Sequence, residues 1–275
     1  MGMQLLHDAG TSSQPHRFPS WVLDWIVPKL PNLSKSRNRG VVFNARGNTK
    51  ARITCLEADS TTAKFKELEV EGYIVDTIKC ASKASNEPSS WSRHFTEVDA
   101  MAEQLSPVFS EQTRQDLKRE VPIAKAKYPQ VAVPGGLDLH QSCQAFRKTL
   151  KKQKYTKKYQ KQRSSPMTSE SVSNAESQEM GLMTKSKSYE LLLGGSIKGR
   201  RFATTELPDC GIVPNNAEEG DGVVVFGGGS VPFIVRKSSE REGMYQLVGE
   251  CFISGIMDWR KVSSGCIQPE ILRLY

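Results

Sequence analysis

The chain of 275 residues lacks the cysteine and histidine spacings of a metal site. Its six cysteines form no CxxC pair, and no histidine lies at the spacing of zinc ligands. They are Cys55, Cys80, Cys143, Cys210, Cys251 and Cys266. We therefore expect reduced thiols, no metal and no cofactor.

Long apolar stretches are also missing. The longest one, GVVVFGGGSVPFIV, is interrupted by glycines and Pro232 and falls short of the roughly 18 residues of a membrane span. The N-terminus, MGMQLLHDAG, has no apolar signal-peptide core, and Leu6 stands where a myristoylation pattern needs Ser or Thr. These features predict a soluble, cytoplasmic protein without a membrane span.

The motifs of nucleotide-binding and hydrolytic enzymes are incomplete. In GGSIKGRR, residues 194–201, Arg200 and Arg201 occupy the P-loop positions of Lys and Ser or Thr, which bind phosphate and magnesium. A helix that stops at Gly194–Gly195 and a strand that starts at Arg201 explain this stretch better. Pro232 takes the last glycine position of a G-x-S-x-G motif around Ser230.

Candidate nucleophiles and bases form no pattern either. Cys251 lies between apolar and aromatic neighbours, as a small core residue does. The histidines fall in an N-terminal arm or on expected helices, and they are His7, His16, His94 and His140. Because a nucleophile needs a base within hydrogen-bond reach, we predict that the chain is not an enzyme. We expect no catalytic, cofactor-binding or metal-binding residues.

The formal charge of +8 comes from one segment. Nine basic residues and no acidic one lie between Arg147 and Arg163, and removing these nine from the 38 basic residues leaves 29 against 30 acidic ones. With Tyr155 and Tyr159 interleaved, the segment would suit a phosphate backbone, an acidic membrane surface or a nuclear localisation signal. A solvated helix end is the simpler interpretation, so nucleic-acid binding by a basic small barrel is the alternative function.

Composition and hydrophobic spacing divide the chain into five parts. They are an extended arm over 1–47, a β-hairpin over 48–80 that joins the barrel, a helical insertion over 88–162, a disordered linker over 163–188 and a C-terminal β-barrel segment over 189–275. The proline-rich arm has one strong anchor, Trp21–Ile26, which we expect to dock on another surface. The linker is rich in Ser, Thr, Glu and Lys without aromatics, so its burial cannot offset the entropy of ordering.

Two kinds of hydrophobic period define the fold class. The first strands are expected at Thr49–Cys55 and Lys66–Ile78, the second with an apolar face and an acidic face. Four further runs, separated by glycine-rich turns, predict hairpins of a small closed sheet: RRFATTE, DGVVVFG, SVPFIVRK and MYQLVGECFISGI. The prediction is an α+β fold, with a small antiparallel β-barrel or curled sheet and a helical insertion.

The helical insertion shows apolar residues three or four positions apart. The clearest stripe predicts a helix after Pro88 and consists of Trp91, Phe95, Val98, Ala102 and Leu105. A second pattern contains Leu117, Val121, Ala124 and Tyr128 and is interrupted by Pro122. A third contains Leu139, Cys143, Phe146 and Leu150 and continues into the basic segment.

Two acidic residues of the C-terminal strands need an explanation. Asp221 follows Gly220 before a valine-rich strand, so its carboxylate is expected to cap the turn. Glu250 lies inside an apolar strand, where a charged group either faces water or needs a partner. Arg236 on a neighbouring run is the partner that we expect.

The C-terminal strands as a block resemble the tail that follows the HET domain in fungal heterokaryon-incompatibility (HET) proteins. The matching positions are Gly199, Arg200, Arg201, Phe202, Thr204, Gly211, Pro214, Gly220, Asp221, Val231, Pro232, Phe233, Arg236, Tyr245, Leu247, Val248, Gly249, Glu250, Gly255, Ile256, Met257 and Asp258. Earlier segments agree in the same order: PSWVLDW, FNARGNTKARI, LEVEGYIVDTI and QAFRKTL. The chain departs from the pattern at Ala203, Ser254 and Trp259–Arg260.

The resemblance covers about residues 18–275 and implies a role in self/non-self recognition and programmed cell death. The HET domain, which carries the death-triggering activity in this family, would precede Pro19 and has no counterpart here. The resemblance therefore implies a non-catalytic C-terminal module with a regulatory or scaffold role and protein partners, either naturally without the HET domain or from a truncated gene product.

Overall fold

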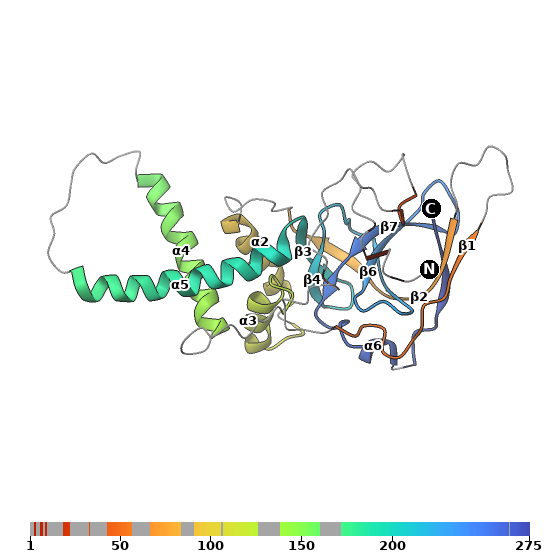
Figure 1. The fold of residues 1–275 in the computed structure, drawn as a ribbon, viewed down its shortest axis with the longest axis horizontal. Coiled ribbons are helices and arrows are strands. Elements are labelled where there is room, and N and C mark those ends of the chain that lie inside the picture. Colours follow the sequence, from red (N-terminus) through yellow and green to blue (C-terminus); the bar gives the residue numbers. More distant parts are fainter. Residues whose placement is uncertain are drawn as a thin grey trace.

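A computed structural model of the chain describes residues 3, 6–7, 9, 19–22, 33, 43–56, 67–83, 91–105, 107–125, 138–159, 172–263 and 265–275. For residues 153–159, 172–180 and 182 the backbone alone is described. The helices between residues 91 and 197 gather at one end of the molecule, and the strands lie at the other together with the short helix Arg260–Ser263 (Figure 1).

The strands are β1 (Ile53–Leu56), β2 (Glu67–Ala81), β3 (Arg200–Thr205), β4 (Cys210–Pro214), β5 (Gly222–Phe226), β6 (Phe233–Lys237), β7 (Met244–Glu250), β8 (Phe252–Ile253) and β9 (Glu270–Leu274). The helices are α2 (Trp91–Gln104), α3 (Glu111–Glu120), α4 (Leu139–Tyr159), α5 (Val172–Ile197) and α6 (Arg260–Ser263). The fold is thus mixed, with a nine-stranded sheet and helices. Within the described residues, no helix is long and apolar enough to cross a membrane.

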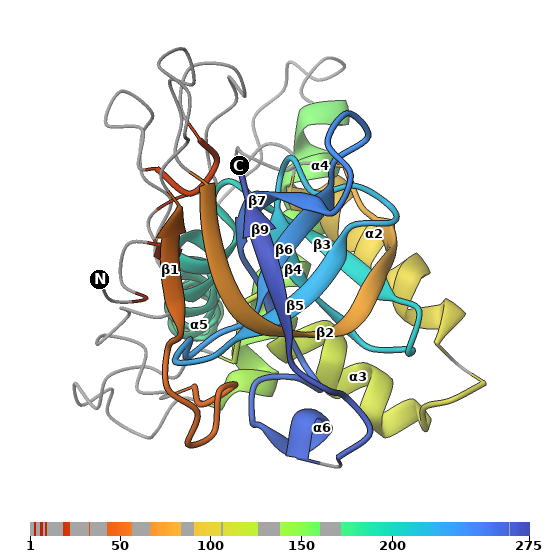
Figure 2. The same cartoon turned by 90° about the vertical axis from the view of Figure 1, so that its right-hand side faces the viewer.

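The long strand β2 organises the sheet and curves across it (Figure 2). Along one edge it pairs first with β1, at Ile53 opposite Val70, and then with β5, at Tyr73 opposite Val225. Along the other edge it pairs with β9 and then with β3. Leu68 and Val70 are buried between half-buried glutamates, as the alternation in the sequence predicts.

Five strands pair in a closed circuit, β2–β5–β6–β7–β9 and back to β2, which we call the ring. Four of its ladders are antiparallel, but β7 and β9 run parallel, at Met244 opposite Arg273. The prediction of an antiparallel sheet is therefore wrong for this ladder. The strand β9 was not among the predicted strands, and its pairing with both β7 and β2 closes the circuit.

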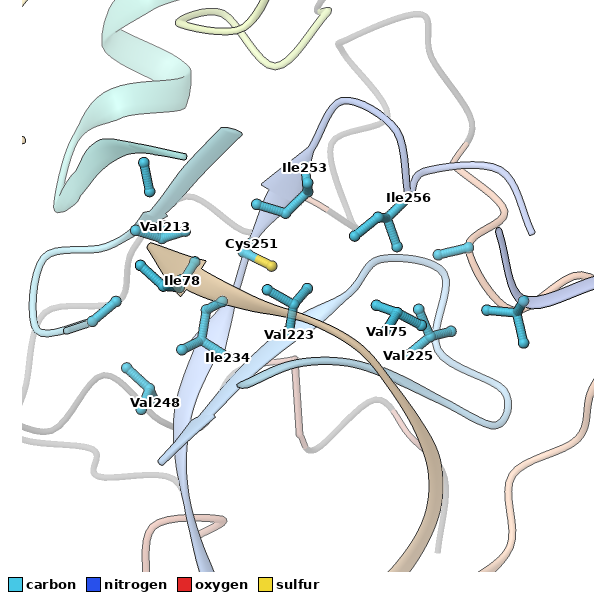
Figure 3. Packing of buried hydrophobic residues seen from close by; sticks show 14 residues of the cluster. Val75, Ile78, Val213, Val223, Val225, Ile234, Val248, Cys251, Ile253 and Ile256 are labelled. Carbon is cyan, nitrogen blue, oxygen red and sulfur yellow. The ribbon is translucent and has the colours of Figure 1, made fainter. Parts of the chain in front are cut away.

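The buried side chains form successive layers. The first lies inside the ring and includes Leu68, Val224, Phe226, Leu247 and Leu272. A second layer lies between the outer face of β5–β7 and the strands β3, β4 and β8, where Val223, Ile234 and Val248 meet Val213 and Ile253 (Figure 3). The opposite faces of β3, β4 and β8 carry Phe202, Ile212 and Phe252 against α2 and α3. Each fully buried large side chain contributes about 1.5–3 kcal/mol.

The predicted stripes of α2 and α4 are confirmed, whereas in the second pattern only Leu117 lies in a helix and Val121 and Ala124 follow in turns beyond it. Trp91, Phe95, Val98 and Ala102 of α2 are all buried. The helix α3 begins after Ser110, whose hydroxyl accepts the Thr113 N–H, and ends before Pro122 as expected. The positions proposed to begin α2, Ser89 and Ser90, and also Tyr128, lie outside the described residues.

The helix α5 corrects two predictions. It begins at Val172, inside the segment predicted to be a disordered linker, and it continues through Gly194–Gly195 to Ile197. Tyr189, Leu193 and Ile197 recur every four residues and are buried against α2 and α4. Tertiary packing of this stripe thus stabilises a helix that composition alone argued against. Gly199, at φ 70°, makes the turn into β3.

The N-terminal arm docks on the ring of its own chain. The Ser20 hydroxyl donates to the Tyr275 carbonyl at 2.5 Å and accepts the Leu247 N–H at 2.9 Å, so it joins the middle of β7 to the residue that follows β9. Trp21 packs against the side chains inside the ring. The other expected anchors, Trp25 and Ile26, lie outside the described residues.

Candidate functional site

The carboxylate of Glu250 is buried at the end of β7, 4% exposed. A bulge places it there: Val235 lies opposite Leu247 and Phe233 opposite Glu250, so two steps on β6 match three on β7. The extra residue turns Glu250 to the same face as Leu247, towards the inside of the ring. Gly249, at φ 144°, supplies the backbone conformation that this requires.

Three groups from distant parts of the chain surround Glu250. Glu250 and these three groups are called the Glu250 cluster. His7 Nδ1 lies 2.5 Å from Oε1, and the Leu33 N–H donates to Oε2 at 2.8 Å. The buried guanidinium of Arg200, at the start of β3, has Nη2 4.0 Å from Oε2. Burial raises the pKa of the adjacent Cys251 thiol well above its usual value, and the charge of Glu250 adds to the effect.

The predicted pairing of Glu250 with Arg236 is wrong. Arg236 lies opposite Gln246 in the ladder, and its guanidinium binds Asp221 instead. The bulge in β7 places Glu250 on the face opposite to that of Gln246 and Arg236, and the sequence does not mark this bulge. Arg200 was not considered as the partner, since it lies fifty positions away from Glu250 in the sequence.

Asp221 caps its turn as expected and also holds Arg236. Its Oδ2 accepts the Glu218 N–H at 2.7 Å, and its two oxygens accept from Nε and Nη2 of Arg236 at 2.8 and 2.9 Å. The Asp221 hydrogen bonds raise the pKa of Arg236, and Glu218 adds a third contact at 3.0 Å. Nearby Arg201 has a lowered pKa because its guanidinium is partly desolvated.

A further group of charged side chains, Asp76, Asp209 and Lys261, joins β2 to α6. Asp76 Oδ1 accepts the N–H groups of Thr77 and Leu207 at 2.8 and 3.1 Å, and its Oδ2 lies 3.8 Å from Lys261 Nζ. Lys261 also donates to Asp209. A Cβ on Gly255 would lie 2.6 Å from the Asp209 carboxylate oxygen Oδ2, so only glycine leaves room for this ion pair.

Two titratable side chains of the helical layer, His94 and Tyr189, are buried. Burial lowers the pKa of His94 to about 4, with Arg147 and Arg93 adding to the effect. Within the part of the chain that the structure describes, neither ring nitrogen of His94 has a hydrogen-bond partner. Burial raises the pKa of Tyr189 well above its usual value, and its hydroxyl donates to the Arg119 carbonyl at 2.8 Å. A neutral imidazole and a protonated phenol are therefore the forms present at neutral pH.

The stretch that resembles an incomplete P-loop forms the junction of α5 and β3. Ser196 donates from its hydroxyl to the Ile123 carbonyl at 2.9 Å, and Arg200 donates to the Ser196 carbonyl at 3.2 Å. These groups bind the chain itself. Among the described residues, no three His, Cys, Asp or Glu side chains could together hold a metal ion.

One known family matches the part of the chain that contains these charged residues. The model of the Het-6 beta-barrel domain matches residues 67–264, which is more than half of the chain. The chain belongs to the Het-6 beta-barrel domain family. This family is of the fungal HET type and fits a heterokaryon-incompatibility protein. No curated protein and no solved structure matches the chain.

The matched part of the Het-6 beta-barrel domain runs from the start of β2 to just beyond α6. It contains Arg200, Glu250, Asp221 and Arg236, and it also contains Asp76. The match does not include β1, β9 or the arm residue Ser20. Nevertheless, β9 closes the ring, and Ser20 accepts a hydrogen bond from β7. His7, which sequence reasoning placed only in the arm, was missed as a partner of Glu250 because no local pattern links the two residues.

Proposed function

We propose that this chain is a non-catalytic C-terminal module of a heterokaryon-incompatibility protein and has a regulatory or scaffold role in self/non-self recognition and programmed cell death. In this proposal the five-stranded ring is the barrel of the domain. The partners are proteins, the location is the cytoplasm, and the chain itself does not trigger cell death.

One observation carries the proposal beyond family membership. Four charged residues of the family resemblance bind each other in pairs: the buried Arg200 with Glu250, and the partly exposed Arg236 with the buried Asp221. Buried ion pairs of this kind fix one arrangement of the strands, because breaking one leaves a charge without compensation. Charges used in this way support a structural and recognition role.

Expression in a filamentous fungus tests the proposal. The chain, placed under an inducible promoter, is expected to leave viability by vital-dye staining equal to that of the empty vector. An incompatibility protein that carries a HET domain, expressed from the same promoter, shows that the assay detects death. A robust death response to the chain alone would overturn the proposal.

The basic segment of α4 supports the alternative, a nucleic-acid-binding protein. Lys148, Lys151 and Lys152 are exposed there, whereas Arg147 binds Asp99 at 2.8 Å and lies over the Phe95 ring. Fluorescence anisotropy with labelled DNA and RNA across a salt series separates the two functions. Binding that weakens with salt and is lost when Lys151–Lys161 are neutralised would support the alternative, and absence of binding would reject it.

A further inference from the structure

Side chains of the N-terminal segment fill the end of the ring where β5 leads into β6, and those that the structure describes are Met3, Leu6, His7 and Ala9. Met3, Leu6 and Ala9 are buried there among the side chains inside the ring. The Leu6 N–H donates to the Met3 carbonyl, and the Ala9 N–H to the Leu6 carbonyl, so consecutive turns present the three side chains. This short segment offers an apolar stripe with a spacing of three residues.

Aromatic side chains line the surface that receives this segment. The ring of His7 lies 5.0 Å from the ring of Phe233, which in turn lies 5.2 Å from Phe226. A Cβ on Gly229 would lie 3.4 Å from both Met3 Cε and Phe233 Cε2, at ordinary contact distance. Gly229 therefore borders the space that Met3 occupies, and a side chain larger than that of alanine would compete with Met3 for it.

A buried charge makes this surface selective. Glu250 lies at its edge and receives His7 at 2.5 Å, next to the Leu33 N–H and Arg200. Since a buried carboxylate needs hydrogen-bond donors, the site favours a segment that places a donor beside its second apolar side chain. Among the described residues, no strand ladder joins residues 3–9 to the sheet, so side chains carry the recognition.

We propose that this end of the ring is a peptide-binding site, and that the chain's own residues 3–9 occupy it. Its ligand class is a short segment with apolar residues at positions i, i+3 and i+6 and a histidine at i+4, and the N-terminal segment of the same chain supplies it. The site would give the proposed recognition module a defined contact for a partner, and in this respect the inference rests on that proposal.

A cleavage and exchange experiment tests the site on a chain that has already folded. A specific protease sequence is inserted after Thr11, and the purified chain is cut. Fluorescein-labelled peptide MGMQLLHDAG is then added, and its anisotropy is measured. We expect saturable uptake by the cut chain and at least tenfold weaker apparent binding by the uncut chain, whose tethered segment competes at high effective concentration.

Matched variants define the specificity. A peptide with Leu6→Asp and His7→Ala is expected to bind at least tenfold more weakly, and Gly229→Val in the cut chain is expected to reduce uptake by filling the space of Met3. Equal uptake by cut and uncut chains, or equal binding of both peptides, would overturn the proposal. So would a cut chain that keeps its circular dichroism spectrum yet takes up no peptide.

If release of the N-terminal segment unfolds the cut chain, peptide binding is measured by the thermal melting transition instead of by anisotropy. Excess wild-type peptide is then expected to restore the melting transition, and the variant peptide is not. Failure of the wild-type peptide to restore it would reject the site. These measurements use purified protein, so their failure is distinguishable from failure of the cell-death assay.

Discussion

Asp221 holds the guanidinium of Arg236 with both carboxylate oxygens, at 2.8 Å from Nε and 2.9 Å from Nη2. Asp221 is buried, whereas Arg236 is partly exposed. Arg236 Nη2 also donates to the Asn216 carbonyl at 2.7 Å. The pair therefore fixes the turn before β5 to the side of β6, where sequence reasoning had expected only a local cap.

Replacing Asp221→Asn is expected to destabilise the chain by about 2 kcal/mol, because a neutral amide cannot accept both charged N–H groups. The free energy of unfolding, from urea titration at pH 7, measures the effect. The control is Glu218→Gln, since Glu218 is an exposed partner of the same arginine and should contribute less than about 1 kcal/mol. Equal losses for both variants would contradict the assigned importance of the buried pair.

The inside of the ring has no space at Gly72. A Cβ there would lie 2.9 Å from Phe226 Cδ1, 3.0 Å from Val224 Cγ1 and 3.1 Å from Leu272 Cδ1, atoms of two other ring strands. Gly72→Ala is therefore expected to cost about 1–3 kcal/mol through overpacking.

The matched control for Gly72 is Gly222→Ala on β5, where the nearest atom, Val235 Cγ2, lies at an ordinary 3.4 Å. We expect it to change the free energy of unfolding much less than Gly72→Ala. Urea titration of both variants decides the matter. If Gly72→Ala were the milder substitution, the inward orientation of Gly72 and the closed packing of the ring would be wrong.

Much of this packing follows from sequence, and the exceptions have physical reasons. The α2 stripe is predictable because Trp91, Phe95 and Val98 lie on one helix face. In contrast, α5 was missed because its buried residues begin only at Tyr189, after a polar stretch whose composition suggested disorder. The partner of Glu250 was missed because a bulge reverses the face of a strand without any mark in the hydrophobic alternation.

His94 makes the stability of the chain depend on pH. Its pKa in the folded chain is about 4, against an ordinary value of 6.5, so the unfolded chain binds more protons between these two values. Stability is then expected to fall as the pH falls below 6.5, by about 2 kcal/mol between pH 7 and pH 5 from this group alone. The positive charges of Arg147 and Arg93 oppose protonation of the His94 imidazole.

The variant His94→Leu is expected to remove that dependence while keeping an apolar side chain in the helical layer. Urea titrations at pH 7, 6 and 5 compare its slope with that of the wild-type chain. The control is His140→Gln, because His140 is exposed and hydrogen-bonded to Gln144. A wild-type slope retained in His94→Leu would show that another group carries the pH dependence.

Thiol labelling tests the layers independently of stability. Cys55 and Cys266 are exposed, whereas Cys210 and Cys251 are buried beside the ring. Burial raises the pKa of Cys210 to about 12, so at pH 8 its thiolate is rarer than that of an ordinary cysteine by about three powers of ten. Iodoacetamide followed by peptide mass spectrometry should therefore label Cys55 and Cys266 within minutes and leave the other two unlabelled. In urea all four should react at similar rates, and native labelling of Cys251 as fast as Cys55 would contradict the packing between β7 and β8.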